Sequence, residues 1–175
     1  MAAILETERV RLRPYTHDDL DDLAAMFADE EHMRFYSHPK SRDESQRWID
    51  WNLDLYQEHG FGLWVMESLD SSEFLGDCGL TPQTVDSVTD IEVGWHTVRS
   101  HWNQGLATEA AAACRDLAFD EIGRRRLISI IHPDNIASRR VAEKIGMTVE
   151  KTAHHGSGPK VIYAIDRLRV LRSSS

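Results

Sequence analysis

The stretch from Ile91 to Glu109 joins a strand pattern to a glycine-containing helix start, and this combination can bind an anion. Its first half alternates as a strand does, and the longest helical pattern of the chain begins at Gly105. The first N–H groups of a helix lack intrahelical partners and lie at the positive end of its dipole. Glycine allows close backbone approach, and the side chain of Ala107 is too small to block it. Amides near Gln104, Gly105, Ala107 and Thr108 are therefore candidates to hold a pyrophosphate, although such a glycine is more often only a turn or cap.

Glu92 is the residue of this strand best suited to acid–base chemistry. Strand side chains alternate, so Glu92, Gly94 and His96 share one face. A carboxylate in a narrow cleft can have a raised pKa and act as a base near neutral pH. The alternative, weighted equally, is that Glu92 pairs with a basic side chain. His96 either shares the site of Glu92 or is solvated.

Several classes of site are excluded by the motifs. The chain has no G-x-x-x-x-G-K-[ST] and no G-x-G-x-x-G after a strand, which argues against a nucleotide triphosphatase or a Rossmann dehydrogenase. Cys78 and Cys114 lack metal-ligand spacing and are expected to be buried free thiols. The histidines, including His32 and His38, also lack such spacing. We therefore predict no metal site.

Composition and charge describe an ordinary globular protein. With 175 residues and 41% hydrophobic residues, the chain fits one compact domain. A formal net charge of −9 argues against nucleic acid as a partner, and it either attracts cationic ligands or only aids solubility. The N-terminus lacks a signal-peptide pattern, and no apolar run approaches the ~20 residues that cross a bilayer. We expect a cytoplasmic protein with no membrane partner.

Periodicity and turn residues predict alternating strands and helices. Ser41 and Glu44 have capping-box spacing for a helix that runs to about His59. The tryptophans of this helix, Trp48 and Trp51, either wall a pocket or pack in the core. The other predicted helices begin after Thr16 and cover 105–122 and 137–145, and the predicted strands are 10–12, 62–67, 73–81, 90–97, 127–131, 147–153 and 161–165.

Five ordered motifs carry a resemblance to a known family. The segment "WNQGLATEA" at 102–110 resembles the coenzyme A pyrophosphate loop of the GNAT superfamily of N-acetyltransferases, and its RimJ/RimL branch, which acetylates ribosomal-protein N-termini, is the most similar. The other motifs are "ETERVRLRPYTHDDLDDL" at 6–23, "FLGDCGL" at 74–80, "IEVGWHT" at 91–97 and "NIASRRVAEKIGM" at 135–147. With "VIYAIDR" at 161–167, the resemblance covers nearly the whole chain.

The resemblance implies an α/β fold with a mixed, mostly antiparallel sheet of about seven strands and about four helices. The sheet is expected to splay between its fourth and fifth strands, with acetyl-CoA in the gap. Residues 1–175 would form a single N-acetyltransferase domain, with a frayed tail at 168–175. The main chain of residues 95–98 would pair with the pantetheine arm. The implied cofactor-binding residues are Trp95, His96, Thr97, Val98, Asn103, Gln104, Gly105, Leu106, Ala107, Thr108, Asn135 and Ser138.

The resemblance also implies direct transfer of the acetyl group to a primary amine, with Glu92 as the base that deprotonates it. Two positions depart from the family pattern. Trp102 stands where most members have Gln or Arg, and Ala142 stands where many have the tyrosine that protonates the leaving thiolate. Ser138 is the candidate to bind that thiolate, and its alternative role, like that of Asn135, is to cap a helix.

The acceptor amine is not specified by the sequence. A protein N-terminus and a small-molecule amine are both compatible with it, and a longer acyl donor is a further option. His154 and His155 either line the acceptor side or are exposed in a loop between the last strands. The resemblance makes a homodimer one option for assembly. The alternative from another class is a coenzyme A-binding sensor with little or no turnover.

Overall fold

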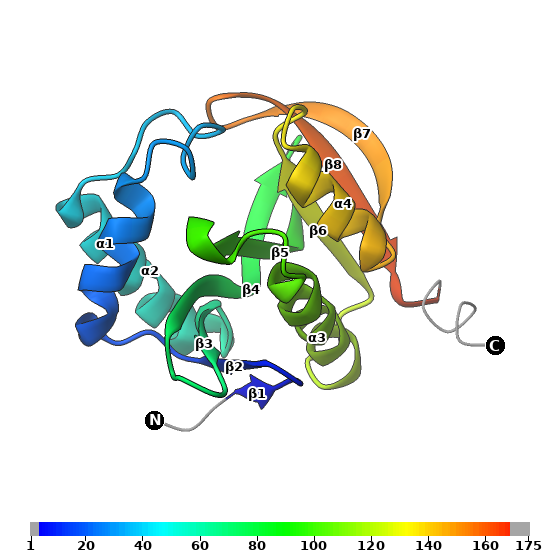
Figure 1. Cartoon of the computed structure of the whole chain (residues 1–175). Helices are drawn as coiled ribbons and strands as arrows, with labels where there is room; N and C mark the ends of the chain where they lie inside the picture. The colour runs from blue at the N-terminus through cyan, green and yellow to red at the C-terminus, as the bar shows by residue number, and fades with distance from the viewer. Residues whose placement is uncertain (1–3, 169–175) are drawn as a thin grey trace.

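The computed structural model describes residues 4–168, which form one eight-stranded sheet flanked by four α-helices (Figure 1). The spatial order of the strands is β1-β2-β3-β4-β5-β6-β8-β7. The strands are β1 Leu5–Glu6, β2 Val10–Arg13, β3 Leu63–Ser68, β4 Phe74–Val85, β5 Val88–Thr97, β6 Arg126–Ile131, β7 Thr148–His155 and β8 Gly158–Asp166. The helices are α1 Leu20–Ala28, α2 Arg42–His59, α3 Leu106–Asp120 and α4 Ile136–Lys144, with short 3-10 turns η1 His17–Asp19 and η2 Arg99–His101.

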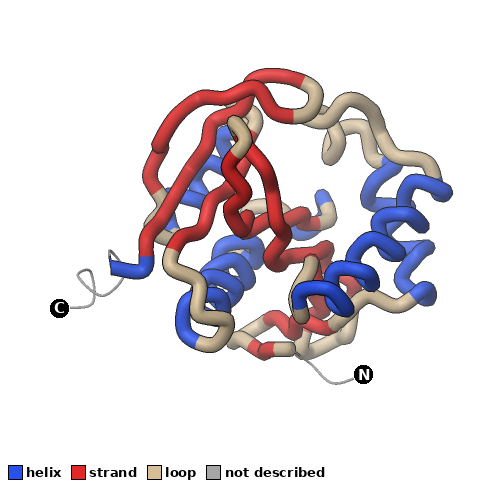
Figure 2. The backbone as a smooth tube through the Cα atoms, turned by 180° about the vertical axis from the view of Figure 1, so that it is seen from behind, coloured by secondary structure: helices blue, strands red, loops and turns tan. Residues whose placement is uncertain are grey.

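The sheet consists of two antiparallel arms that meet at one point. β1 to β5 form the first arm, and β6, β8 and β7 form the second. Between the arms, β5 and β6 run parallel and share a single aligned pair, Glu92 with Ile128. Beyond this pair the strands diverge, and Figure 2 shows from behind how the two groups of strands separate. The predicted mixed, mostly antiparallel sheet with a splay is therefore confirmed.

The sheet contains one strand that the sequence did not predict. The sheet has eight strands where about seven were expected, and it opens, as predicted, between the strands expected at 90–97 and 127–131, which are β5 and β6 because the short β1 precedes them. The added strand is β1, whose two residues pair with β2 after a turn closed by Thr7 N donating to the carbonyl of Val10 (2.8 Å). Two residues are too few to show a strand period, which is why the sequence did not predict β1.

The helices cover opposite faces of the first arm. Alternate residues of β3 point to opposite sides. Leu63 and Val65 pack in a core with α1 and α2, whereas Trp64 and Met66 pack in the core that contains α3. Figure 1 shows α1 and α2 together on one side and α3 and α4 on the other. This layering leaves the open end of the splay between the loop 29–41 and α4.

Most predicted elements lie where expected. The Ser41–Glu44 capping box is present, and α2 ends at His59 before Gly60 in the left-handed conformation. Cys78 and Cys114 are buried and unpaired, with their sulfurs 3.7 Å apart, and burial raises the pKa of Cys78. The last hairpin differs, because β7 and β8 extend through most of the predicted loop and leave a turn at Gly156–Ser157.

Three further observations bear on the sequence-based expectations. No described helix is long and apolar enough to cross a membrane. Within residues 4–168, no group of three or more His, Cys, Asp or Glu side chains is arranged to hold a metal ion. The predicted frayed tail, apart from Leu168, lies outside the described residues.

Candidate active site

Glu92 lies where the two arms of the sheet separate. Its Oε1 accepts a hydrogen bond from the backbone N–H of Ile130 on β6 (3.1 Å), and the hydroxyl of Thr81 lies 3.5 Å from its Oε2. Burial raises the pKa of Glu92 to about 7, against the opposing effect of the Ile130 hydrogen bond. Among the described ion pairs none involves Glu92. This carboxylate is therefore outside the described ion pairs, with His96 as a charged or neutral neighbour, and its proton affinity suits a base near neutral pH.

A cavity of about 280 Å³ opens in front of Glu92. Aromatic side chains from the loop 29–41 and from α2 form one wall, and the turn between β7 and β8 forms another. His155 lies on this cavity, whereas His154 does not. Its lining includes Phe35, Tyr36, Trp48, Trp51, Gln83, Ser129, His132, His155 and Lys160. Trp48 and Trp51 thus wall a pocket and also pack against the core of α1 and α2.

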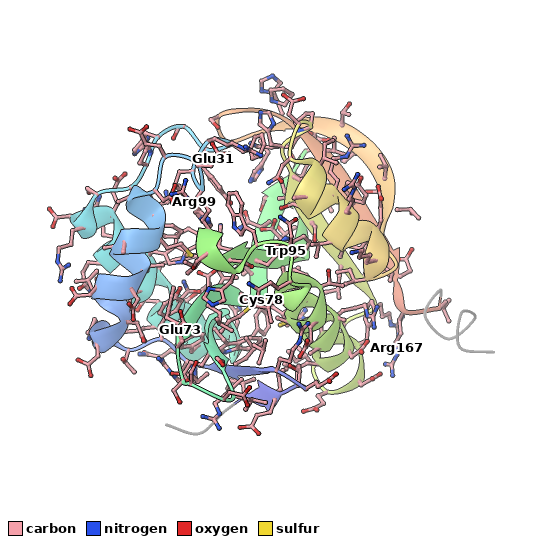
Figure 3. All side chains as sticks on the ribbon, in the orientation of Figure 1. Glu31, Glu73, Cys78, Trp95, Arg99 and Arg167 are labelled. Carbon is pink, nitrogen blue, oxygen red and sulfur yellow. The ribbon has the colours of Figure 1, made fainter. Side chains whose placement is uncertain are left out.

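A second cavity of about 490 Å³ continues from the first toward the start of α3. It reaches the loop residues Asn103, Gly105, Ala107 and Thr108, and on its other side Arg140 and Lys144 of α4. Figure 3 shows Trp95 at the centre of the molecule, between β5 and α4. Residues that line both cavities are Phe35, Tyr36, Trp95, His96, Asn135 and Ser138. The two cavities together form one path from the helix start to Glu92.

The start of α3 leaves its backbone N–H groups uncapped. Gly105 is the N-cap residue, with φ +79° and no capping side chain, and Asn103 also has a positive φ of 61°. Glu109 N donates the first helical bond to Gly105 O (3.0 Å), so the N–H groups of Leu106, Ala107 and Thr108 have no helical acceptor. A Cβ at position 105 would meet only Arg9 Nη2, at 3.5 Å. The space in front of this turn therefore fits an anion.

Two side chains hold the loop before α3 in place. Arg9 donates to the carbonyl of Gln104 (2.8 Å) and pairs with Glu109 (2.7 Å). Trp102 Nε1 donates to the carbonyl of Thr97 (2.7 Å). Trp102, the first departure from the family pattern, therefore ties the loop to β5.

The main chain of β5 faces the gap at only some of its predicted contact positions. Val98 N donates to the carbonyl of Leu75 on β4 (2.9 Å), and Ser129 Oγ donates to the carbonyl of Val93 across the gap (2.7 Å). Antiparallel strands alternate in this way, so the backbone groups of Trp95 and Thr97 face the gap and those of His96 and Val98 face β4. The contact of residues 95–98 with a pantetheine arm stays a prediction, for which the backbone groups of Trp95 and Thr97 are available.

Asn135 caps α4, and Ser138 does not. The Asn135 side-chain oxygen accepts a hydrogen bond from Ser138 N (3.1 Å). Ser138 faces both cavities, and in the described part of the chain its hydroxyl forms no hydrogen bond. Ala142 is fully buried in the core, so this position supplies no acid.

Tyr36 and Asp77 are site residues that sequence reasoning missed. Asp77 is fully buried on β4 and lies 2.6 Å from His96 Nδ1, while Tyr36 OH lies 2.7 Å from His96 Nε2. His96 is therefore enclosed near Glu92 and not solvated, with 11% of its side chain exposed. An aspartate inside the apolar run "FLGDCGL" was a signal for Asp77, whereas Tyr36 lies in a loop without any pattern.

Comparisons with known proteins agree with this geometry. Residues 9–148 match the family model described as an acetyltransferase (GNAT) domain. YkkB of Bacillus subtilis (strain 168) is 39% identical over 160 residues, covering 91% of this chain and 93% of YkkB. An acetyltransferase structure from Agrobacterium tumefaciens str. C58 is 26% identical, with a TM-score of 0.82, covering 93% of this chain and 94% of that one.

Two structures solved with coenzyme A share the fold at lower identity. The ribosomal-protein acetyltransferase RimL is 17% identical, with a TM-score of 0.75, and the match covers 94% of this chain and 98% of RimL. An aminoglycoside acetyltransferase is 20% identical, with a TM-score of 0.76, and the match covers 95% of this chain and 99% of that enzyme.

The chain belongs to the GNAT acetyltransferase family. It is an N-acetyltransferase of the acetyl-CoA-dependent kind, which acts on amine acceptors.

Proposed function

We propose that the chain transfers the acetyl group of acetyl-CoA directly to a primary amine in the cavity beside Glu92. The observation that carries this proposal is the position of Glu92, a carboxylate outside the described ion pairs that lines the first of two connected cavities. A pKa of about 7 leaves a substantial fraction of Glu92 both deprotonated and able to accept a proton at neutral pH. An ammonium substrate must lose a proton before its nitrogen can attack, and Glu92 would accept it.

The start of α3 would hold the pyrophosphate of acetyl-CoA. The uncapped N–H groups, the left-handed Gly105 and the open space in front of it fit two linked phosphates. The backbone groups of Trp95 would extend the contact along the pantetheine arm. Bound acetyl-CoA supplies a thioester whose acetyl carbon is open to attack by an amine.

Ser138 would orient the sulfur end of the cofactor. Its hydroxyl lies on both cavities at the first turn of α4, and it is not used to cap that helix. A serine hydroxyl is a weak acid, so its contribution is a hydrogen bond to developing negative charge rather than full protonation.

The first cavity sets the size of the acceptor. A volume of about 280 Å³ admits a small-molecule amine or the first residue of a peptide chain. RimJ/RimL-type activity, the acetylation of protein N-termini, is the specific form of this proposal, and the cofactor-bound RimL structure shares the fold. Aromatic walls at Trp48, Trp51 and Tyr36 would attract the cationic or apolar part of an acceptor.

The test is release of free coenzyme A thiol with a panel of primary amines and peptides with free N-termini, in wild type and Glu92→Gln. Glutamine keeps the shape and can still accept from Ile130 N. We expect kcat/KM of the variant to fall by about 10²–10⁴-fold at neutral pH, with acetyl-CoA binding retained. Wild-type activity should rise with pH through about 7, because a base acts when deprotonated, and this rise should be absent in the variant. Tight binding of acetyl-CoA without turnover on any acceptor would support the sensor alternative instead.

A further inference from the structure

Tyr36 ends a chain of hydrogen bonds that begins at the buried carboxylate of Asp77. Asp77 Oδ2 accepts from the hydroxyl of Tyr15 (2.8 Å) and from Trp48 Nε1 (3.1 Å). Its Oδ1 lies 2.6 Å from His96 Nδ1, and His96 Nε2 lies 2.7 Å from Tyr36 OH. The base in front of the cavity, Glu92, does not belong to this chain.

The donors around Asp77 fix the direction of the hydrogen bonds. Burial and the neighbouring Asp77 raise the pKa of Tyr15, so its hydroxyl remains a donor. Because Asp77 is an acceptor, the proton of a neutral His96 ring resides on Nδ1. His96 Nε2 then has a free lone pair, and Tyr36 donates its O–H to that nitrogen.

Three rings enclose His96, and one of them is a neutral histidine. Phe27, Trp48 and His32 pack around it, with ring centroids 5.6, 5.7 and 5.9 Å away. Burial and His96 lower the pKa of His32 to about 4, so His32 stays neutral at pH 7. The other titratable groups that face His96 are Tyr36, Asp77 and Glu92.

The Tyr36 end of this hydrogen-bond chain lies where the two cavities meet. Tyr36 and His96 both line the cavity beside Glu92 and the cavity that leads to the start of α3. Tyr36 is 45% exposed, so its ring borders the path while its hydroxyl points to His96. Position 142 on α4 holds an alanine, so the acid that the thiolate needs must come from another element.

We propose that Tyr36 is a catalytic proton carrier of the acetyl transfer, with His96 and Asp77 as positioning residues that hold and return its proton. This inference rests on the proposed function. A primary ammonium becomes an amide by losing two protons, and the departing thiolate gains one. Glu92 accepts the first proton and releases it to solvent.

Tyr36 moves the second proton. As the C–N bond forms, the Tyr36 oxygen accepts the remaining surplus proton of the nitrogen and passes its own to His96 Nε2, leaving an imidazolium paired with Asp77. As the C–S bond breaks, His96 returns that proton and Tyr36 donates one to the sulfur. Burial raises the pKa of the Tyr36 phenol above its ordinary value, so the phenol is too weak an acid to do this alone, and the imidazolium behind it supplies the acidity. The relay ends in the state in which it began.

The first arm of the test examines the ligand-free protein by ¹⁵N NMR of the His96 ring. We expect Nδ1 to carry a proton and Nε2 to show an accepted hydrogen bond. Tyr36→Phe should shift the Nε2 resonance, and Tyr163→Phe, which removes a phenol hydroxyl bonded to Glu143 outside both cavities, should not. An Nε2 resonance unchanged by Tyr36→Phe would overturn the relay, whether or not an acceptor has been found.

The second arm measures transfer kinetics on an acceptor that the wild type uses. Tyr36→Phe should lower kcat by about 10²–10⁴-fold, with KM for acetyl-CoA within about twofold, because the ring is retained. Asp77→Asn should cause a comparable loss by favouring the wrong tautomer of His96. The double variant should lose little more than either single one, since the residues act as a unit. An unchanged kcat in Tyr36→Phe, or losses that multiply in the double variant, would overturn the proposal. A wild type that acetylates no amine would instead overturn the proposed function.

Discussion

The N-termini of α2 and α3 both have backbone N–H groups without a helical acceptor, and only those of α2 are capped by side chains. At α2, Ser41 and Glu44 form a reciprocal capping box, in which Glu44 N donates to the Ser41 hydroxyl and Ser41 N donates to the Glu44 carboxylate. At α3, Gly105 supplies no side-chain cap, and the first N–H groups face a cavity. One helix start serves stability, and the other is left open for a ligand. The absence of a side-chain cap at α3 therefore says more about where a ligand binds than the presence of a helix does.

Gly105→Asp should have the largest effect on ligand binding at the start of α3, because it puts a carboxylate where the phosphates would bind. We expect the affinity for acetyl-CoA to fall by about 100-fold or more, equivalent to about 2.7 kcal/mol. Calorimetric titration of wild type and variant measures this change.

Gly123→Asp is the matched control for that experiment. Gly123 has φ +77°, nearly the same as Gly105, and a Cβ there meets nothing within 4 Å. The control therefore carries the same added charge and the same backbone strain away from the cavities. Equal loss of binding in both variants would show that strain or net charge, and not the pyrophosphate site, explains the effect.

Ser41→Ala should have the opposite profile at α2. Removing the capping hydroxyl is expected to lower the free energy of unfolding by about 1 kcal/mol. Acetyl-CoA affinity should stay the same, since Ser41 lines neither cavity. Urea unfolding together with calorimetry checks both parts, and a loss of affinity without a loss of stability would contradict the division of roles.

Sequence alone predicted one of these helix starts more fully than the other. The capping box was readable because it depends on two residues at fixed spacing, and α2 has the predicted bounds. The anion site at α3 was readable as a hypothesis from Gly105 and its position after a strand. The hydrogen bond from Arg9 to the Gln104 carbonyl could not be predicted in this way, because it joins residues 95 positions apart.

The same limit applies to the chemistry. Glu92 could be predicted from strand alternation and the family resemblance, but its pKa depends on β6 closing over it. The chain from Asp77 to Tyr36 joins β4, β5 and the loop 29–41, and no local pattern encodes such a contact. Local rules thus predicted the elements, whereas the contacts between distant elements needed the fold.

Arg9→Met tests whether the loop before α3 must be held in place. The variant loses the bond to the Gln104 carbonyl and leaves Glu109 without its cation beside the expected phosphates. We expect a two- to fivefold weaker affinity for acetyl-CoA, from about 0.3–1 kcal/mol of charge interaction at a helix N-terminus. Adding Glu109→Gln should recover part of this loss at low salt. No recovery would assign the effect to loop geometry rather than charge.

Glu44→Gln should produce the smallest effect, visible only in acid. The backbone N–H of Ser41, helped by His38, lowers the pKa of Glu44 to about 2 in the folded protein. A lowered folded pKa contributes stability above the unfolded value near 4.3, and this contribution is lost as the pH falls toward 2. Glutamine keeps the capping geometry but does not titrate. The difference in unfolding midpoint between wild type and variant should therefore shrink or reverse between about pH 4.5 and pH 2, while Ser41→Ala remains destabilised throughout. If the difference in unfolding midpoint stayed constant over this range, Glu44 would stabilise α2 through its shape alone, and its charge would contribute nothing to the capping box.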